Sequence, residues 1–191
     1  MSTALSTAQI NGEYAIDPSH SRIGFAARHA MVAKVRGSFN DFEGTGYLDL
    51  DEPSKSNLQL TIQVASIDTR NEDRDNHLRT NDFFDIENYP EIRFTSTGVE
   101  KVDAETFRVT GDLTVKDVTR PVTFDLEYEG VAVDPFQNQR VGLEGSLVVN
   151  RKDFGLSWNA ALDAGGVLVS EKVTLEFEVS AIKASVTADR A

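Results

Sequence analysis

The sequence Leu-Gln-Leu-Thr-Ile-Gln-Val at residues 58–64 alternates strictly between apolar and polar side chains. Residues 173–181, Val-Thr-Leu-Glu-Phe-Glu-Val-Ser-Ala, repeat this alternation far downstream. A period of two is typical of a β-strand with one dry and one wet face. Strands that share a dry side can close into a barrel, whose interior is filled by side chains or holds an apolar ligand.

Further alternating segments predict an all-β fold, an antiparallel barrel of about eight strands. We expect these strands at residues 22–29, 42–50, 58–67, 92–96, 107–115, 122–128, 141–149 and 173–182. Gly44 and Gly46 indicate a bend or a close approach of two backbones within the second of them. A barrel of this size has room for side chains alone or for a narrow ligand.

One short helical insertion is expected between Asp68 and Pro90, where the period of two stops. Thr69-Arg70-Asn71-Glu72 matches a capping box and predicts the start of the helix. A stripe along this helix and the two aromatic residues after it comprise Arg70, Arg74, His77, Leu78, Phe83 and Phe84. Cations beside aromatic rings suit a ligand with an anionic head and an apolar tail. The alternatives are a solvated salt-bridge face and a pair of rings that plug the end of the barrel.

The composition limits the classes of function. The chain has 191 residues, no cysteine and a formal net charge of −12, which disfavours nucleic acid and anionic membranes unless a basic patch is concentrated locally. No apolar run approaches the roughly 20 residues that span a bilayer, so no stable membrane insertion is expected. The start lacks the pattern of an export signal, which favours the cytoplasm. We expect one domain over residues 12–183, with flexible tails at 1–11 and 184–191.

Catalytic chemistry finds little support in the sequence. The three histidines, His20, His29 and His77, match no zinc spacing, so no metal site is predicted. His29 shares the parity of Ile23 and Phe25, which fits a hydrogen-bonded histidine at the end of the core as well as a ligand contact. The sequence contains no nucleophile elbow, phosphate-binding loop, dinucleotide fingerprint or paired carboxylates. Trp158 is expected to pack at an end of the barrel.

Ordered short motifs throughout the chain resemble the YceI-like family of polyisoprenoid-binding or lipid-binding domains. They are Tyr14-Ala15-Ile16-Asp17-Pro18-Ser19-His20-Ser21, Arg28-His29, Lys34-Val35-Arg36-Gly37-Ser38-Phe39, Ser66-Ile67-Asp68-Thr69, Arg74-Asp75-Asn76-His77-Leu78-Arg79, Asp82-Phe83-Phe84-Asp85, Tyr89-Pro90, Gly111-Asp112-Leu113-Thr114-Val115-Lys116 and Arg151-Lys152-Asp153-Phe154-Gly155-Leu156. The resemblance covers roughly residues 12–183. It implies an extended, lipocalin-like barrel with a long apolar channel for an isoprenoid or another long-chain amphiphile, and it brings no catalytic residue.

The expected function is therefore non-enzymatic binding, storage or transport of such a lipid, with no cofactor other than the lipid itself. The alternatives are an enzyme that uses the three histidines, with or without a metal, on a lipid-like substrate, and a packed barrel without a cavity. A homodimer with two joined channels would suit a ligand longer than one barrel. The expected ligand-binding residues are His20, Phe25, Arg28, His29, Leu60, Ile62, Arg74, His77, Phe83, Phe84, Phe94, Phe124 and Phe177.

Overall fold

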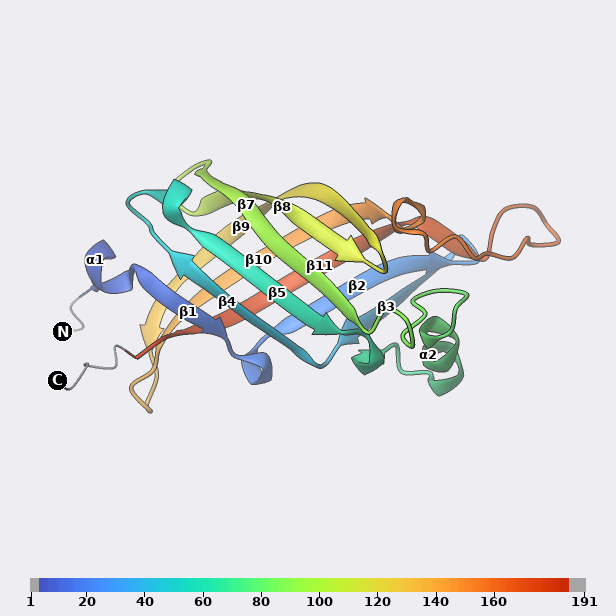
Figure 1. Cartoon of the computed structure of the whole chain (residues 1–191), viewed down its shortest axis with the longest axis horizontal. Helices are drawn as coiled ribbons and strands as arrows, with labels where there is room; N and C mark the ends of the chain where they lie inside the picture. Colours follow the sequence, from blue (N-terminus) through green and yellow to red (C-terminus); the bar gives the residue numbers. More distant parts are fainter. Residues whose placement is uncertain (1–3, 186–191) are drawn as a thin grey trace.

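Alternating apolar side chains form the walls of an elongated β-barrel in the computed structural model, which describes residues 4–185 (Figure 1). The strands are β1 (Gly12–Ile16), β2 (Arg22–His29), β3 (Ala33–Phe39), β4 (Phe42–Leu48), β5 (Asn57–Gln63), β6 (Ile67–Asp68), β7 (Glu91–Lys101), β8 (Thr106–Val115), β9 (Val118–Val133), β10 (Gln139–Asn150) and β11 (Val169–Lys183). The α-helices are α1 (Thr7–Ile10) and α2 (Glu72–Arg79), and the 3-10 helices are η1 (Pro18–His20), η2 (Pro53–Lys55), η3 (Val64–Ser66) and η4 (Arg151–Phe154).

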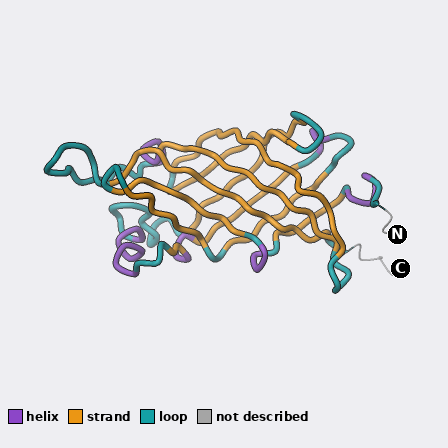
Figure 2. The backbone as a smooth tube through the Cα atoms, turned by 180° about the vertical axis from the view of Figure 1, so that it is seen from behind, coloured by secondary structure: helices purple, strands orange, loops and turns teal. Residues whose placement is uncertain are grey.

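The barrel closes as a ring of eight antiparallel strands. Their order is β1-β4-β5-β7-β8-β9-β10-β11, and β1 pairs with β11 to complete the ring. β2 continues along β11 beyond β1, β3 pairs with β2, and β6 pairs with β3. The strands cross the long axis at a slant, as closure of a barrel requires (Figure 2). The predicted antiparallel barrel of about eight strands is thus confirmed.

Several predicted strand boundaries differ from the structure. β1 and β3 were not expected as separate strands, and the strand predicted over residues 58–67 ends at Gln63. It ends because Val64–Ser66 forms η3, where the Ser66 hydroxyl donates to the Gln63 carbonyl oxygen at 2.6 Å. The close backbone approach expected at Gly46 is confirmed, since an added Cβ atom would collide with the carbonyl oxygen of Asn57 on β5.

The single helical insertion exists but is short, and its predicted capping box is wrong. Asn71 caps α2, because its side-chain oxygen accepts a hydrogen bond from the Arg74 backbone N–H at 2.8 Å. The Thr69 hydroxyl donates instead to the buried carboxylate of Asp75 at 2.5 Å. Thr69 therefore ties the helix to the end of β6 and does not begin it.

Part of the predicted N-terminal tail belongs to the folded domain. Thr7–Ile10 forms α1, and Ile10 is buried in a cluster with Tyr14, Val141 and Ala181 at one end of the barrel. This helix therefore packs on the barrel, and the flexibility of the tails stays a prediction. Residues 1–3 and 186–191 of the predicted tails lie outside the described residues.

A charged network fastens the corner between β1 and η1 to the β9–β10 hairpin at the same end. The Arg140 guanidinium contacts the carboxylates of Asp17 and Asp134, each at 2.7 Å. Its hydrogen bonds lower the pKa of Asp134 to about 2 and hold the pKa of Asp17 far below its usual range. Both carboxylates therefore stay ionised in the folded protein until the solution is strongly acidic.

Among residues 4–185, no helix is both long enough and apolar enough to cross a membrane.

Candidate functional site

The barrel interior contains a cavity of about 300 Å³. It extends from Tyr14 and Leu48 near α1 to Phe83 and Leu156 near α2. This volume lies at the lower end of the range for small-molecule pockets. The alternative of a barrel filled by its own side chains is therefore wrong.

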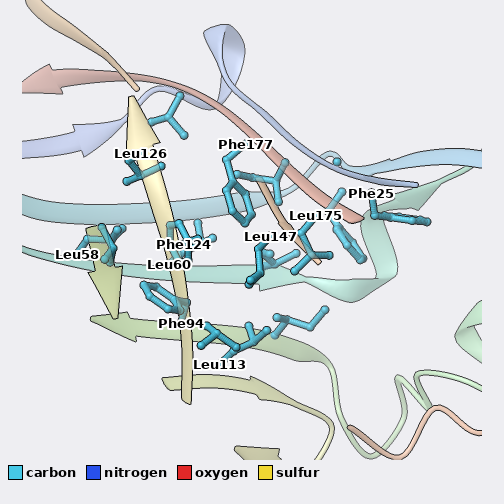
Figure 3. A pocket seen from close by; sticks show the side chains of 18 of the residues that line it. Phe25, Leu58, Leu60, Phe94, Leu113, Phe124, Leu126, Leu147, Leu175 and Phe177 are labelled. Atoms are coloured by element: carbon cyan, nitrogen blue, oxygen red, sulfur yellow. The ribbon is translucent and has the colours of Figure 1, made fainter. Parts of the chain in front are cut away.

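The walls of the cavity are almost entirely apolar. Inward-facing side chains from several strands are half-buried, and their free surfaces contribute to the cavity lining (Figure 3); they include Leu58, Leu60, Leu147, Leu175 and Phe177. The rings of Phe94 and Phe124 lie 5.5 Å apart, and those of Phe124 and Phe177 lie 5.4 Å apart. Such walls offer dispersion contacts and burial of apolar surface, and they offer few hydrogen bonds.

Aromatic side chains of α2 and of two connections pack together at the end of the cavity near α2. The ring centroids of Phe83 and Trp158 are 5.3 Å apart, and the His77 ring lies 4.7 Å from Trp158 and 5.2 Å from Phe83. Phe83 is buried, and both Phe83 and Phe84 line the cavity. The expectation that Trp158 packs at an end of the barrel is confirmed.

Arg151 is a buried cation in this apolar lining. Its guanidinium donates to the carbonyl oxygens of Leu156 at 2.5 Å, Ser170 at 2.8 Å, Trp158 at 2.9 Å and Val169 at 3.3 Å. Burial lowers the pKa of Arg151 from its ordinary value. These bonds use four of the five guanidinium N–H groups, so Arg151 fastens both ends of the connection between η4 and β11.

The apolar side chains that the sequence predicted as ligand contacts all lie around the cavity. They are Phe25, Leu60, Ile62, Phe83, Phe84, Phe94, Phe124 and Phe177. Sequence reasoning missed most aliphatic lining residues, such as Leu113, Leu126 and Leu147, although they follow the same alternation. It also missed Arg151 as part of the lining, because nothing local indicates that its charge points inward.

The polar side chains of the prediction lie outside the lining and have other partners or face solvent. The imidazole of His20 contacts Asp17 at 2.7 Å, and that of His77 contacts Asp82 at 2.8 Å. Arg74 donates to the Thr69 hydroxyl and carbonyl oxygens, both at 2.7 Å. Their contact with a ligand stays a prediction.

Arg28 and His29 are exposed at the far end of β2, so the placement of His29 in the core is wrong. β2 spans roughly 23 Å at the usual rise per residue, and it separates His29 from His20. Across residues 4–185, no three His, Cys, Asp or Glu side chains are grouped to hold a metal ion. The arrangement gives the histidine-based enzyme no supporting observation.

Comparison with known proteins identifies the family. A family model described as YceI-like domain matches residues 14–181. The chain belongs to the YceI-like family. Its relatives include a UPF0312 protein of Staphylococcus epidermidis, 39% identical over 170 residues that cover 88% of this chain and 95% of the relative. A UPF0312 protein of Staphylococcus aureus is 37% identical over 169 residues, with the same coverage of both chains.

Solved structures share the YceI-like barrel. The YceI protein of Campylobacter jejuni is similar with a TM-score of 0.72 and 30% identity, covering 83% of this chain and 90% of that one. BcnA of Burkholderia cenocepacia has a TM-score of 0.77 and 22% identity over 86% of this chain and 98% of that one. A domain of Saccharophagus degradans, described as polyisoprenoid binding, has a TM-score of 0.67 and 16% identity over 90% and 98% of the two chains. The last two likenesses concern the fold alone.

Proposed function

We propose that this YceI-like protein binds an isoprenoid or another long-chain amphiphilic lipid in its barrel and stores or carries it unchanged. The observation that carries the proposal is the apolar cavity of about 300 Å³. Each buried CH₂ group contributes about 0.8 kcal/mol, so the tail of the ligand would provide most of the affinity. The description of the Saccharophagus degradans domain as polyisoprenoid binding supports this class of ligand.

A quinone with a prenyl tail and a polyprenyl diphosphate are the proposed ligands. Trp158, the single tryptophan, packs against Phe83 of the cavity lining and supplies a spectroscopic signal. We expect decylubiquinone to quench its fluorescence at a stoichiometry of one per chain. Native mass spectrometry of the gently purified protein, followed by solvent extraction, would identify a lipid that is already bound. Absence of both uptake and co-purified lipid contradicts the proposal.

Two neighbouring positions on β10 provide a matched test of where the ligand lies. Leu147 lines the cavity, whereas the side chain of Val148 is 59% exposed on the outside. Leu147→Phe adds bulk to the cavity and should weaken decylubiquinone binding at least tenfold. Val148→Phe adds bulk outside and should change it less than twofold. Equal effects of the two substitutions would place the ligand elsewhere.

Arg74 and His77 are proposed to orient the head group, as donors on α2 near this end of the cavity. The double variant Arg74→Ala with His77→Ala tests this role in the same fluorescence titration. A fall in affinity of less than twofold removes both residues from the proposal.

The proposed compartment is the cytoplasm, which immunodetection in fractionated cells would test.

A further inference from the structure

The turn between β2 and β3 exposes apolar side chains at one end of the barrel. Met31 is 61% exposed and Val32 is 82% exposed. Val167, on the connection between β10 and β11, is 41% exposed. Figure 1 shows that connection projecting at the right-hand end, beside the β2–β3 turn. We call Met31, Val32 and Val167 together the apolar tip.

Backbone and side-chain contacts hold the two parts of the apolar tip together. The Ala30 N–H donates to the carbonyl oxygen of Leu168 at 2.7 Å. The Met31 sulfur lies over Gly166, where an added Cβ atom would collide with it. The apolar tip is thus one surface, built from segments far apart in the sequence.

Positive charge is concentrated beside the apolar tip, in a chain of net charge −12. No acidic residue occurs between Asp17 and Asp41, whereas Arg22, Arg28, Lys34 and Arg36 all lie there. Arg28 and Lys34 face each other across the β2–β3 pair, and Arg36 follows two residues later on the same face. These three are exposed, and within residues 4–185 none of them forms a salt bridge, whereas Arg22 pairs with Glu176.

The acidic residues on the neighbouring connection leave this positive charge in excess. Residues 159–172 contain Asp163 and Glu171 together with Lys172. Glu171 is paired with Lys152 at 2.7 Å. Residues 28–36 carry three positive charges and no negative one. Since residues 159–172 add two negative charges and one positive charge, the two segments together have a net charge of +2.

The hairpin that carries the apolar tip also forms part of the cavity wall. Phe25 and Ala27 of β2 line the cavity, and so does Val169, which pairs with His29. The apolar tip therefore lies directly beyond one end of the cavity. A lipid that moved from a membrane into the barrel at the apolar tip would reach the cavity lining within the length of a few residues.

We propose that the apolar tip docks the protein reversibly on an anionic lipid bilayer. Met31, Val32 and Val167 enter the headgroup region, while Arg28, Lys34 and Arg36 contact the acidic headgroups. Apolar side chains flanked by cations are typical of interfacial binding. This docking goes beyond the proposed function, because it names the surface at which the cavity would exchange its lipid.

Among the described residues, the opposite end of the barrel does not have this combination. Phe136, which is 84% exposed, and Val133 lie on the β9–β10 hairpin. They flank the carboxylate of Asp134, whose charge does not complement acidic headgroups. This hairpin therefore supplies a matched apolar control.

Vesicle flotation tests the docking, with vesicles of phosphatidylcholine alone or mixed with phosphatidylglycerol. We expect binding to the mixed vesicles at about 0.1 M salt, since exposed charges are then screened only beyond about 10 Å. Each cation near an anionic surface strengthens binding roughly fivefold. The triple variant R28Q, K34Q and R36Q should therefore lose at least tenfold in partitioning.

The apolar contribution is tested by the double variant Met31→Asn with Val32→Thr. Ala30 and Met31 both have left-handed backbone conformations, with φ of 48° and 62°. Asparagine tolerates this conformation well, so the variant keeps the turn while it removes the apolar surface. We expect at least a tenfold loss of partitioning, because the apolar surface that these side chains bury in the bilayer contributes to the free energy of binding and also orients the protein.

The controls are K55Q, K101Q and R108Q for the change in charge, and V133T with F136S for the change in apolar surface. Both should retain partitioning within twofold. Equal binding to neutral and anionic vesicles, no binding to either, or an equal loss in the controls overturns the proposal. Quenching of Trp158 by decylubiquinone in vesicle-free solution is measured on every variant. A protein that docks without quenching contradicts the lipid-carrier function alone, whereas one that quenches without docking contradicts the apolar tip alone.

Discussion

Replacement of Arg151 by methionine is expected to destabilise the barrel strongly. The aliphatic stem of the side chain is retained in Arg151→Met, so most of its packing stays. The guanidinium is lost, and with it the donors to the carbonyl oxygens of Leu156, Trp158, Val169 and Ser170. Four hydrogen bonds contribute about 1 kcal/mol each on average.

Relief of the buried charge offsets part of that loss, because a desolvated cation is itself unfavourable. We therefore expect the free energy of unfolding to fall by about 3 kcal/mol. Urea titration followed by Trp158 fluorescence and by circular dichroism measures this change. Arg151→Lys should recover only part of the loss, since an ammonium lacks the planar fork that reaches several carbonyl oxygens.

Arg108→Met serves as the matched control, since Arg108 forms a surface ion pair with Asp125 in which both side chains are 44% exposed. Such pairs contribute about 0–1 kcal/mol. Amide exchange in Arg151→Met should accelerate first in residues 156–169, the connection that Arg151 fastens. A loss below about 1 kcal/mol, or exchange that accelerates uniformly, would refute the role given to the guanidinium.

Three further outcomes are expected from other parts of the barrel. Arg140 lowers the pKa of Asp17 and of Asp134 in the folded protein, the latter to about 2. The stability that this contributes is fully present above the unfolded pKa near 4 and is lost as the pH falls. The urea midpoint of Arg140→Gln should therefore fall less steeply between pH 4 and pH 2 than that of the unchanged protein. Tyr128→Phe should raise stability by about 1 kcal/mol, since the buried hydroxyl has no partner among the described residues; a lower melting temperature would show that it has one. Gly46→Ala should cost about 2 kcal/mol in urea unfolding through its collision with the facing strand, and a neutral effect would mean that the strands can separate there.

Alternation in the sequence was sufficient to predict the long strands of the barrel. β11 and the β8–β9 hairpin lie where the period of two placed them, because alternate side chains along each strand point into the barrel. The number of about eight strands follows from the same alternation, although the predicted set contained β2 where the ring contains β1. β1 and β3 were missed because two parts of the wall are each built from two short strands. β1 and β2 pair with successive parts of β11, and β4 and β3 pair with β1 and β2 in turn. The breaks between these short strands carry no strong signal in the sequence.

The sequence predicted the apolar residues of the site, because burial of apolar surface determines where they lie. It predicted the polar residues less well, because their positions depend on hydrogen-bond partners elsewhere in the chain. Phe94 and Phe124 reach the cavity because their strands leave them no other dry face. The partners of Arg74 and His77 are Thr69 and Asp82, and the fold brings these together through turns that local propensity does not fix. The same limit applies to Thr69, whose match to a capping box was overridden by its hydrogen bond to Asp75.

The cations beside the apolar tip are separated from the negative charge of the rest of the chain, and this affects how membrane binding depends on salt. At low ionic strength the Debye length reaches about 30 Å. The net charge of −12 then interacts with an anionic bilayer over that distance, and the interaction is repulsive. At intermediate salt that distant repulsion is screened, while Arg28, Lys34 and Arg36 act at contact distance. At high salt the contact attraction weakens as well. Association with a membrane should therefore pass through a maximum as salt is raised, whereas a uniformly basic protein would show a steady decline.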